Sequence, residues 1–233
     1  MYSNRYIFIY ASVMVVVVAV VLSTIATLLK PMQDANIKME KIQSILASFH
    51  IESTQDNAFE LFENHIKHQY IVNYEGSYEK GNAFDVDLRV ELRKPIEERQ
   101  MPLFEVSDLN NRKNYVIPLY GGGLWGPIWG YMALKEDFKT INGVIFDHQG
   151  ETPGLGAEIS TPVFEKQFKD KRIFDKDHNF VSVKVVKGGA AKDDPHAVDG
   201  ISGGTITSDG VSDMLKNNIR FYLNFYEQNI LTK

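Results

Sequence analysis

The residues between Asp199 and Val211 have the types and spacing that bind an anion. They read Asp-Gly-Ile-Ser-Gly-Gly-Thr-Ile-Thr-Ser-Asp-Gly-Val, a run of small and hydroxyl-bearing residues that leads directly into a helical pattern. A helix N-terminus presents unpaired backbone N–H groups and the positive end of the helix dipole, and Gly203 and Gly204 let the backbone approach a ligand closely. The run therefore favours an anion site, most naturally for phosphate. A glycine-rich turn before an ordinary helix cap is the alternative that spacing alone leaves open.

The helix that must carry this site is predicted from the residues that follow the run. Apolar side chains recur there at steps of three and four, which lines one face of a helix: Val211, Met214, Leu215, Ile219, Tyr222, Leu223 and Tyr226. Thr207, Ser208 and Asp209 offer capping oxygens just ahead of them. We therefore expect the helix to begin at about residue 209. Spacing leaves open whether Phe221 and Phe225 belong to the core or to an interface.

The same run is similar to the flavinylation motif of membrane flavoproteins whose FMN is held by a phosphoester to threonine. That motif has an Asp, two free positions, Ser or Thr, Gly, a small residue and the acceptor Thr, which are here Asp199, Ser202, Gly203, Gly204 and Thr205. The family usually has Ala at the position of Gly204. Gly204 in this chain makes the loop more flexible but leaves the acceptor hydroxyl in place. The resemblance implies that Thr205 carries the flavin, while Thr207 and Ser208 cap the helix.

A second glycine-rich stretch, Gly121-Gly-Gly-Leu-Trp-Gly126, formally matches the dinucleotide fingerprint G-x-G-x-x-G. A strand is predicted before it, but the residues after it, Pro127-Ile-Trp-Gly-Tyr, do not start a long helix, so we reject a dinucleotide fold. Leu124, Trp125 and Trp129 lie beside backbone that a ligand can approach, and aromatic rings in that setting suit a flat conjugated ligand. A simple turn between two strands, with Trp129 in the core, is the alternative.

A third stretch, residues 148–156, follows a predicted strand and reads His-Gln-Gly-Glu-Thr-Pro-Gly-Leu-Gly. The residues in it that offer polar contacts or shape the loop are Glu151, Thr152, Pro153, Gly154, Leu155 and Gly156. A His and a Glu together can perform acid–base catalysis, yet no second carboxylate or nucleophile is recognisable. On chemistry alone, a structural turn and a ligand loop explain the stretch equally well.

Three separated motifs together resemble the C-subunit family of the Na⁺-translocating NADH:quinone oxidoreductase. They are Gly123-Leu-Trp-Gly-Pro127, Glu151-Thr-Pro-Gly-Leu-Gly156 and Ser202-Gly-Gly-Thr205, and the resemblance covers essentially the whole chain. The G-subunit family of the Rnf ferredoxin-linked complex, which shares the FMN-threonine motif, is the alternative. A membrane-anchored binding module without redox chemistry is the alternative of a different class.

The resemblance implies a specific function. It implies FMN bound covalently at Thr205, installed by a separate flavin transferase, in a subunit that relays electrons from NADH towards ubiquinone and is coupled to sodium transport. Its partners would be the other subunits of the membrane redox complex. By position, Trp125, Thr152, Leu155 and Gly156 would lie near the isoalloxazine ring. Glu151 and Asp199 would orient their loops, and no catalytic residue is expected because the flavin performs the electron chemistry.

The composition agrees with a cofactor that does not depend on cysteine. The chain has 233 residues and no cysteine, which excludes disulfides, thiolate nucleophiles and protein-held iron–sulfur clusters. Of the net charge of -5, residues 1–30 hold +2, which leaves -7 for residues 31–233 and does not suit nucleic acid. His65 and His68, one turn apart on a predicted helix, have no third ligand nearby, so no metal site is expected.

The N-terminus contains a candidate membrane span. Ile7 to Leu29 are 23 consecutive uncharged residues, which as a helix would span roughly 34 Å, enough for a bilayer core. A cleaved signal peptide is the alternative, but its apolar region is usually only about 7 to 15 residues long. We expect a retained single-pass anchor. Flanking lysines favour a cytoplasmic domain, whereas the family resemblance implies the cell inner membrane with a periplasmic domain.

The remaining pattern predicts an α+β fold with a mostly antiparallel sheet and flanking helices after one N-terminal transmembrane helix. Helices are predicted over Pro31–Phe49, Asn57–Tyr70 and Pro162–Lys171, and strands over Phe84–Leu92, Tyr115–Leu119, Ile128–Leu134, Ile141–Phe146 and Val181–Val186. Residues 95–112 read as loop. The expected parts are an anchor over 1–30, a helical segment over 31–80 and an FMN-binding domain over 81–233.

Overall fold

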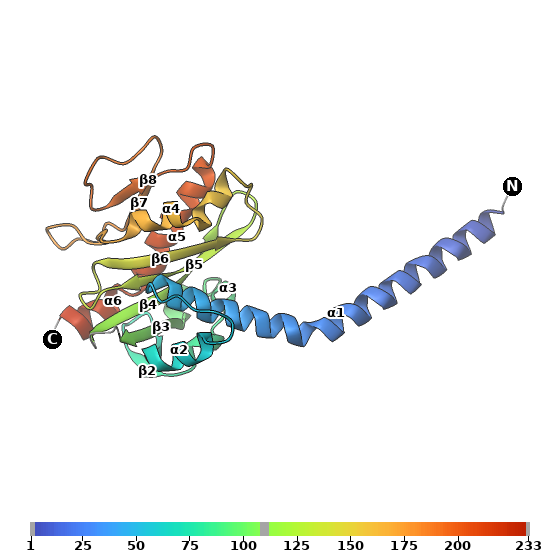
Figure 1. Ribbon diagram of the computed structural model, residues 1–233, viewed down its shortest axis with the longest axis horizontal. Helices are drawn as coiled ribbons and strands as arrows, with labels where there is room; N and C mark the ends of the chain where they lie inside the picture. The colour runs from blue at the N-terminus through green and yellow to red at the C-terminus, as the bar shows by residue number, and fades with distance from the viewer. Residues whose placement is uncertain (1–2, 108–111, 232–233) are drawn as a thin grey trace. The chain divides into compact units, whose positions relative to one another are not determined.

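The computed structural model describes residues 3–107 and 112–231 and divides into two compact units, residues 1–41 and 42–233. The described part of the first unit consists mainly of helix α1, Asn4–Ser48, up to Lys41, and the second unit is an α+β domain (Figure 1). This confirms the predicted fold class.

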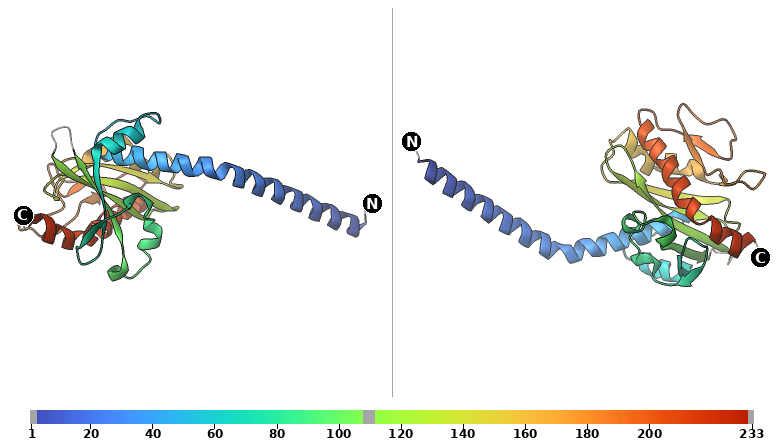
Figure 2. Two further views of the ribbon diagram at one scale, coloured as in Figure 1. Left: turned by 90° about the horizontal axis from the view of Figure 1, so that it is seen from below. Right: turned by 180° about the vertical axis from the view of Figure 1, so that it is seen from behind.

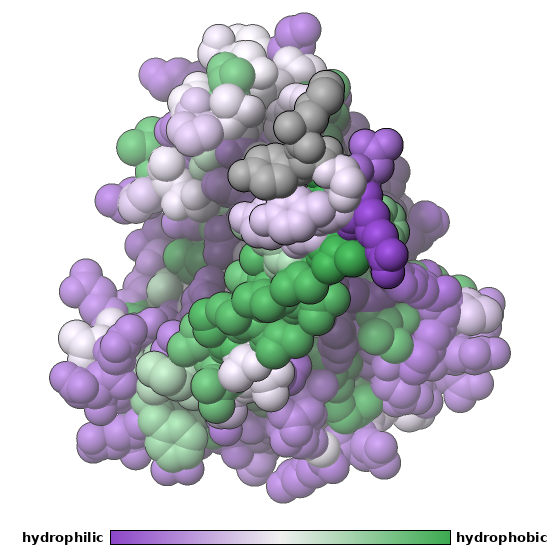
Figure 3. All heavy atoms as spheres, turned by 90° about the vertical axis from the view of Figure 1, so that its right-hand side faces the viewer, coloured by the Kyte–Doolittle hydropathy of each residue, from purple (hydrophilic) through white to green (hydrophobic). Residues whose placement is uncertain are grey.

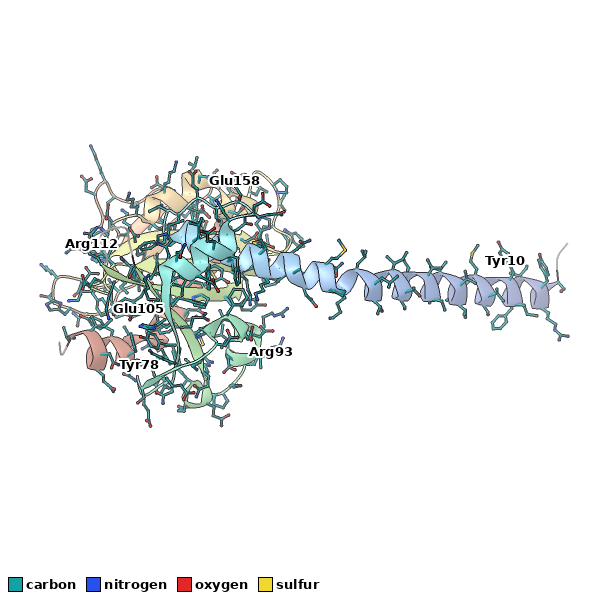
Figure 4. The ribbon with its side chains drawn as sticks, turned by 60° about the horizontal axis from the view of Figure 1, so that its bottom comes forward. Tyr10, Tyr78, Arg93, Glu105, Arg112 and Glu158 are labelled. Atoms are coloured by element: carbon teal, nitrogen blue, oxygen red, sulfur yellow. The ribbon has the colours of Figure 1, made fainter. Side chains whose placement is uncertain are left out.

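Helix α1 carries the apolar N-terminal segment, and its side chains there are exposed. Among the described residues it is the one helix whose length and composition suffice to cross a bilayer. The apolar side chains form one continuous hydrophobic band in Figure 3, and Tyr10 projects from the helix in Figure 4. The predicted helix after Pro31 is a continuation of α1, since Pro31 lies inside it.

A six-stranded antiparallel sheet forms the centre of the domain. Its strands are β1 (Ile66–Val72), β2 (Tyr78–Lys80), β3 (Met101–Ser107), β4 (Lys113–Gly122), β5 (Pro127–Leu134) and β6 (Ile141–His148), in the order β2-β1-β3-β4-β5-β6. β4 and β5 form a hairpin whose last pair is Gly122 with Pro127. The glycine-rich stretch at 121–126 is therefore a hairpin end and turn, as its alternative interpretation predicts.

Helices cover both faces of this sheet (Figure 2). On one face lies α5 (Thr205–Phe221), whose buried residues join those of β4 and β5 in the main core, among them Ile117, Leu119, Ile128, Met132, Val211 and Leu215. On the other face lie the end of α1 and α2 (Ala58–His65). There the Phe62 ring meets Phe104 at a centroid distance of 6.4 Å. The domain thus has three layers.

Short elements complete the domain. A parallel pair, β7 (Lys184–Val186) and β8 (Ala197–Asp199), is linked to α5 because the Val185 N–H donates to Ser212 Oγ at 2.9 Å. The others are η1 (Ala83–Asp85), α3 (Leu88–Glu91), η2 (Ile96–Glu98), η3 (Gly156–Ser160), α4 (Pro162–Glu165), η4 (Lys166–Phe168), α6 (Leu223–Tyr226) and η5 (Glu227–Leu231).

The C-terminal helices hold the β1–β2 hairpin by side-chain amides. Asn224 Nδ2 donates to the carbonyl of Tyr74 at 2.7 Å, and Asn229 Nδ2 donates to the carbonyl of Gly76 at 2.9 Å. The last helical residues therefore pack onto one of the first strands of the domain. Phe221 and Phe225, which spacing could not assign, are buried in the core.

Three secondary-structure predictions are wrong. The alternating segment Phe84–Leu92 is not a strand, because η1 and α3 occupy it and the Asp87 carboxylate caps α3 by accepting from the Arg89 N–H at 2.9 Å. The range 95–112 is not a loop throughout, because it contains the buried strand β3; residues 108–111 lie outside the described residues. The helix predicted to reach Tyr70 ends at His65, so His65 and His68 do not lie one turn apart on a helix.

Candidate functional site

The three motifs meet at one end of the domain around the carboxylate of Glu151. Its Oε1 accepts from the backbone N–H of Trp125 at 2.9 Å, and its Oε2 accepts from Thr207 Oγ1 at 2.6 Å. The side chain comes from the loop after β6, Trp125 from the β4–β5 turn, and Thr207 from the first turn of α5. Contacts thus connect stretches that lie 26 and 56 residues from Glu151.

The β4–β5 turn presents two apolar side chains to solvent. The Gly123 N–H donates to the Gly126 carbonyl at 2.7 Å, which closes a tight turn. The side chains of Leu124 and Trp125 at its tip are 47% and 69% exposed. Trp129, by contrast, is half-buried within β5 and pairs with Tyr120. Trp125 is therefore the tryptophan that a ligand at this end can reach.

The loop after β6 contains a turn whose sequence fixes its geometry. The Leu155 N–H donates to the carbonyl of Thr152 at 3.1 Å, with Pro153 and Gly154 between them. Gly154 has φ +76°, which is the conformation that a type II turn requires after proline. The Glu158 carboxylate, labelled in Figure 4, accepts from the Gly154 N–H at 3.1 Å. The turn holds Leu155 with its side chain 41% exposed.

This turn packs directly against the glycines that precede α5. A Cβ placed on Gly203, which has φ +75°, would lie 2.5 Å from Leu155 Cδ2. A Cβ on Gly204 would lie 3.0 Å from Ile201 Cγ2 and 3.4 Å from the nitrogen of Gly156. The absence of side chains at the two glycines therefore lets Leu155 and Ile201 pack against this backbone.

Helix α5 begins at Thr205, four residues earlier than predicted, and its N-cap is Gly204 without a side-chain cap. The first backbone N–H to find a helical acceptor is that of Ser208, which donates to Gly204 O at 2.9 Å. Within the described residues, the N–H groups of Thr205, Ile206 and Thr207 donate to no acceptor. The helix end therefore offers an anion three backbone donors.

Only some of the hydroxyl groups in this run are free to react. Thr207 is buried and bound to Glu151, and Ser208 Oγ accepts from the Ile201 N–H at 3.2 Å. The prediction that these two residues cap the helix is wrong, because both already lie in its first turn. In the part of the chain that the structure describes, the Thr205 hydroxyl has no hydrogen-bond partner, and its residue is partly exposed. Ser202 is exposed in the loop ahead of it.

Asp199 uses its side chain within the protein. Its Oδ1 accepts from the Ala190 N–H at 2.8 Å, and its own N–H donates to Gln167 Oε1 at 2.8 Å. The carboxylate is thereby engaged with the loop between β7 and β8. These contacts agree with a loop-orienting role.

Sequence reasoning missed the residues that bring α5 onto the sheet. A Cβ on Gly210 would lie 2.3 Å from the carbonyl oxygen of Gly122, and one on Gly121 would lie 2.8 Å from Met214 Cβ. Helix and strand therefore touch through glycines. A glycine inside a predicted helix costs about 1 kcal/mol relative to alanine, so Gly210 was the available signal for such close packing.

One buried carboxyl group near the site has a shifted pKa. Burial raises the pKa of Glu165 to about 6, the N–H of Phe146 at 2.8 Å from Oε1 opposes this shift, and the charge of Asp147 adds to it. Glu165 thereby holds β6 just before the loop that carries Glu151. Among the described residues, no group of three His, Asp or Glu side chains has a geometry that could hold a metal ion.

The donor set and its surroundings fit FMN. Three backbone N–H groups and a free threonine hydroxyl suit a phosphoester, and the exposed side chains of Leu124, Trp125 and Leu155 suit a flat apolar ring. The site thus has separate places for the two chemically different ends of the cofactor.

Comparisons with known proteins agree with this fit. Residues 123–220, which contain all three motifs, match the family model of the FMN-binding domain. The chain is similar to the C-subunit of the Na⁺-translocating NADH-quinone reductase of Vibrio vulnificus, with 32% identity over 84% of this chain and 82% of the relative. The corresponding protein of Vibrio alginolyticus is 33% identical over the same shares.

A solved structure gives the same answer. The crystal structure of the C-subunit of the Na⁺-translocating NADH-quinone reductase from Parabacteroides distasonis is 42% identical, has a TM-score of 0.79, and covers 86% of this chain and 98% of its own. These relatives are named for the quinone reductase. With its three motifs assembled at one site and its relatives matched over most of their length, the chain belongs to the C-subunit family of the Na⁺-translocating NADH-quinone reductase, an oxidoreductase complex.

Proposed function

We propose that this protein carries FMN in phosphoester linkage to Thr205 and passes electrons between other subunits of a Na⁺-translocating NADH-quinone reductase, from NADH towards ubiquinone. The observation that carries the proposal is the state of Thr205. Its hydroxyl is the one in the first turn of α5 without a hydrogen-bond partner among the described residues, and it lies beside three unpaired backbone N–H groups.

The helix end would hold the phosphate. A phosphodiester keeps one negative charge, which the N–H groups of Thr205, Ile206 and Thr207 can receive. The helix dipole would stabilise that charge by roughly 0.3 to 1 kcal/mol. The exposed carboxylate of Asp209, one turn further along the helix, opposes this slightly.

The apolar side chains around Thr205 would hold the ring. Leu124 and Trp125 in the β4–β5 turn and Leu155 in the loop after β6 are exposed large apolar residues. Thr152 and Gly156 belong to the same loop as Leu155. When bound, FMN supplies the electron chemistry, and protein groups position it and adjust its potential. A ring held by exposed side chains stays at the surface, where another protein of the complex can approach it.

The proposal includes how the protein is matured and where it sits. A flavin transferase would attach the FMN, to which the partly exposed Thr205 is accessible. Helix α1 would anchor the protein in the cell inner membrane by a single span, with the large domain in the periplasm. We propose an anchor over residues 1–30 and an FMN-binding domain over 81–233, joined by the segment 31–80, whose strands β1 and β2 complete the sheet.

The test is the replacement of Thr205 by Val, which keeps the branched shape and removes the hydroxyl. The full-length protein is produced with a flavin transferase, run on a denaturing gel under ultraviolet light, and mapped by peptide mass. We expect a fluorescent band with FMN mass on the Thr205 peptide in the unmodified chain and in the matched control Thr54→Val, which makes the same change at an exposed threonine outside the three motifs. The Thr205→Val protein should be folded and dark. Covalent flavin that persists in that variant would disprove the assignment.

A further inference from the structure

Glu151 is a buried carboxylate with an unusual set of partners. The residue is 4% exposed, and each carboxylate oxygen accepts one hydrogen bond, Oε1 from Trp125 N–H and Oε2 from Thr207 O–H. Its own backbone N–H donates to Nδ1 of His148 at the end of β6, at 3.2 Å. Glu151 is thus attached to the sheet at its backbone and to two other segments at its side chain.

The two motif glycines nearest to Glu151 make room for this carboxylate. A Cβ on Gly123 would lie 2.4 Å from Oε1, and a Cβ on Gly156 would lie 2.3 Å from Oε2. Real Cβ atoms do not approach so closely, so neither position accepts a side chain while the carboxylate is in place. Gly123 at the start of the Gly-Leu-Trp-Gly-Pro stretch and Gly156 at the end of the Thr-Pro-Gly-Leu-Gly stretch are therefore both required by the Glu151 carboxylate.

We propose that Glu151 is a positioning residue that assembles the site without touching the cofactor. Its carboxylate fixes the turn that carries Trp125 against the first turn of α5 that carries Thr205. It also binds the Thr207 hydroxyl two residues beyond the acceptor, and so leaves Thr205 as the hydroxyl that projects from the helix start. The role in flavin placement rests on the function proposed above, whereas the mechanical link between the segments does not.

The link can be tested on the full-length protein in detergent before any flavin is attached. Hydrogen exchange followed by mass spectrometry reports the peptide that spans residues 121–126, where the Trp125 N–H is protected by Glu151. Glu151→Ala should speed exchange in this peptide. Glu151→Gln should restore most of the protection, since its amide oxygen accepts from Trp125 and its NH₂ group can donate to Thr207. The matched control is Glu158→Ala, which removes a carboxylate that, within the described residues, accepts from Gly154 in its own loop.

A double variant tests whether the Glu151 carboxylate is the reason that residue 123 is a glycine. Gly123→Ala should lower the thermal denaturation temperature when Glu151 is present, because the new methyl group meets Oε1. In the Glu151→Ala background the same substitution should lower it far less, although the methyl group still meets Ile128 Cγ2 at 2.9 Å. Equal losses in the two backgrounds, or exchange at 121–126 that does not respond to Glu151→Ala, would overturn the proposal.

The flavin-loaded protein supplies the last readout. Visible circular dichroism of the bound FMN reports how firmly the ring is held. We expect Glu151→Ala to lose most of this signal while FMN mass stays on the Thr205 peptide, and Glu151→Gln to recover it. If the unmodified chain takes up no FMN, the proposed function fails and the exchange and double-variant experiments still decide the link. An unchanged signal in Glu151→Ala would refute the role in flavin placement.

Discussion

The buried carboxyl group of Glu165 makes the stability of the domain depend on pH. Its pKa rises from 4.5 to about 6 because burial disfavours the charge. Between these two values the native state binds a proton that the unfolded state has released, so the free energy of unfolding falls as the pH rises through the window. A shift of about 1.5 units at 1.36 kcal/mol per unit corresponds to about 2 kcal/mol. The loss is complete above about pH 7 and absent below about pH 4.

Replacing Glu165 by Gln removes the titrating carboxyl group and keeps the hydrogen bond from the Phe146 N–H. The amide oxygen can still accept from the Phe146 N–H, which Oε1 now accepts at 2.8 Å. We expect the variant to exceed the unmodified protein by up to about 2 kcal/mol at pH 7.5 and to match it near pH 4. Urea denaturation of the full chain in detergent across this range measures the difference. The exposed Glu79→Gln serves as control and should show no such trend. Parallel stability curves for Glu165→Gln and the unmodified chain would refute the reasoning.

Three further substitutions probe the packing around the site and the core. Tyr222 is fully buried and its hydroxyl donates to the Pro102 carbonyl at 2.7 Å. Tyr222→Phe leaves that carbonyl unpaired, so it should lower the free energy of unfolding, measured by urea denaturation, by about 1–3 kcal/mol. An unchanged denaturation midpoint would contradict this. Gly210→Ala improves helix propensity by about 1 kcal/mol, yet its methyl group would meet Gly122 O at 2.3 Å, so we expect a lower melting temperature and reduced FMN loading rather than a gain. Gly204→Ala meets its nearest side-chain atom at 3.0 Å and should keep full FMN loading on the peptide map, and a dark band would show that the loop needs glycine there.

The sheet could be predicted from the sequence where its strands show ordinary patterns. β4, β5 and β6 are rich in β-branched and aromatic residues and are separated by glycine or aspartate, and all three were found. β3 was missed because it is buried along nearly its whole length, so it shows no alternation between apolar and polar residues. The segment Phe84–Leu92 alternates between apolar and charged residues as a strand would. It nevertheless forms short helical turns, one of which is capped by Asp87. An alternation of apolar and charged residues is therefore compatible with more than one backbone conformation.

The sequence predicts which residues form the site, but not the contacts that join them. The resemblance selected Thr205 and the loop of Leu155, and the structure places both at the same end of the domain. The start of α5 at Thr205 was missed because the local sequence offers better capping groups after it than before it. The bond from Glu151 to Thr207 spans 56 residues, a separation over which one sequence carries no pattern. Such a contact follows from the tertiary fold alone.

The amide contacts between the C-terminal helices and the β1–β2 hairpin determine when this domain can fold. Asn224 and Asn229 bond to residues 150 and 153 positions earlier, and Tyr222 to a residue 120 positions earlier. Contacts of such separation are slow to form, because the chain must close long loops before it gains their stabilisation. The hairpin pairs locally, but the side-chain bonds to its turn form only when residues 222–231 are present. On the function proposed above, FMN attachment would follow synthesis of the whole chain, because α6 and η5 continue directly from α5, whose first turn presents Thr205.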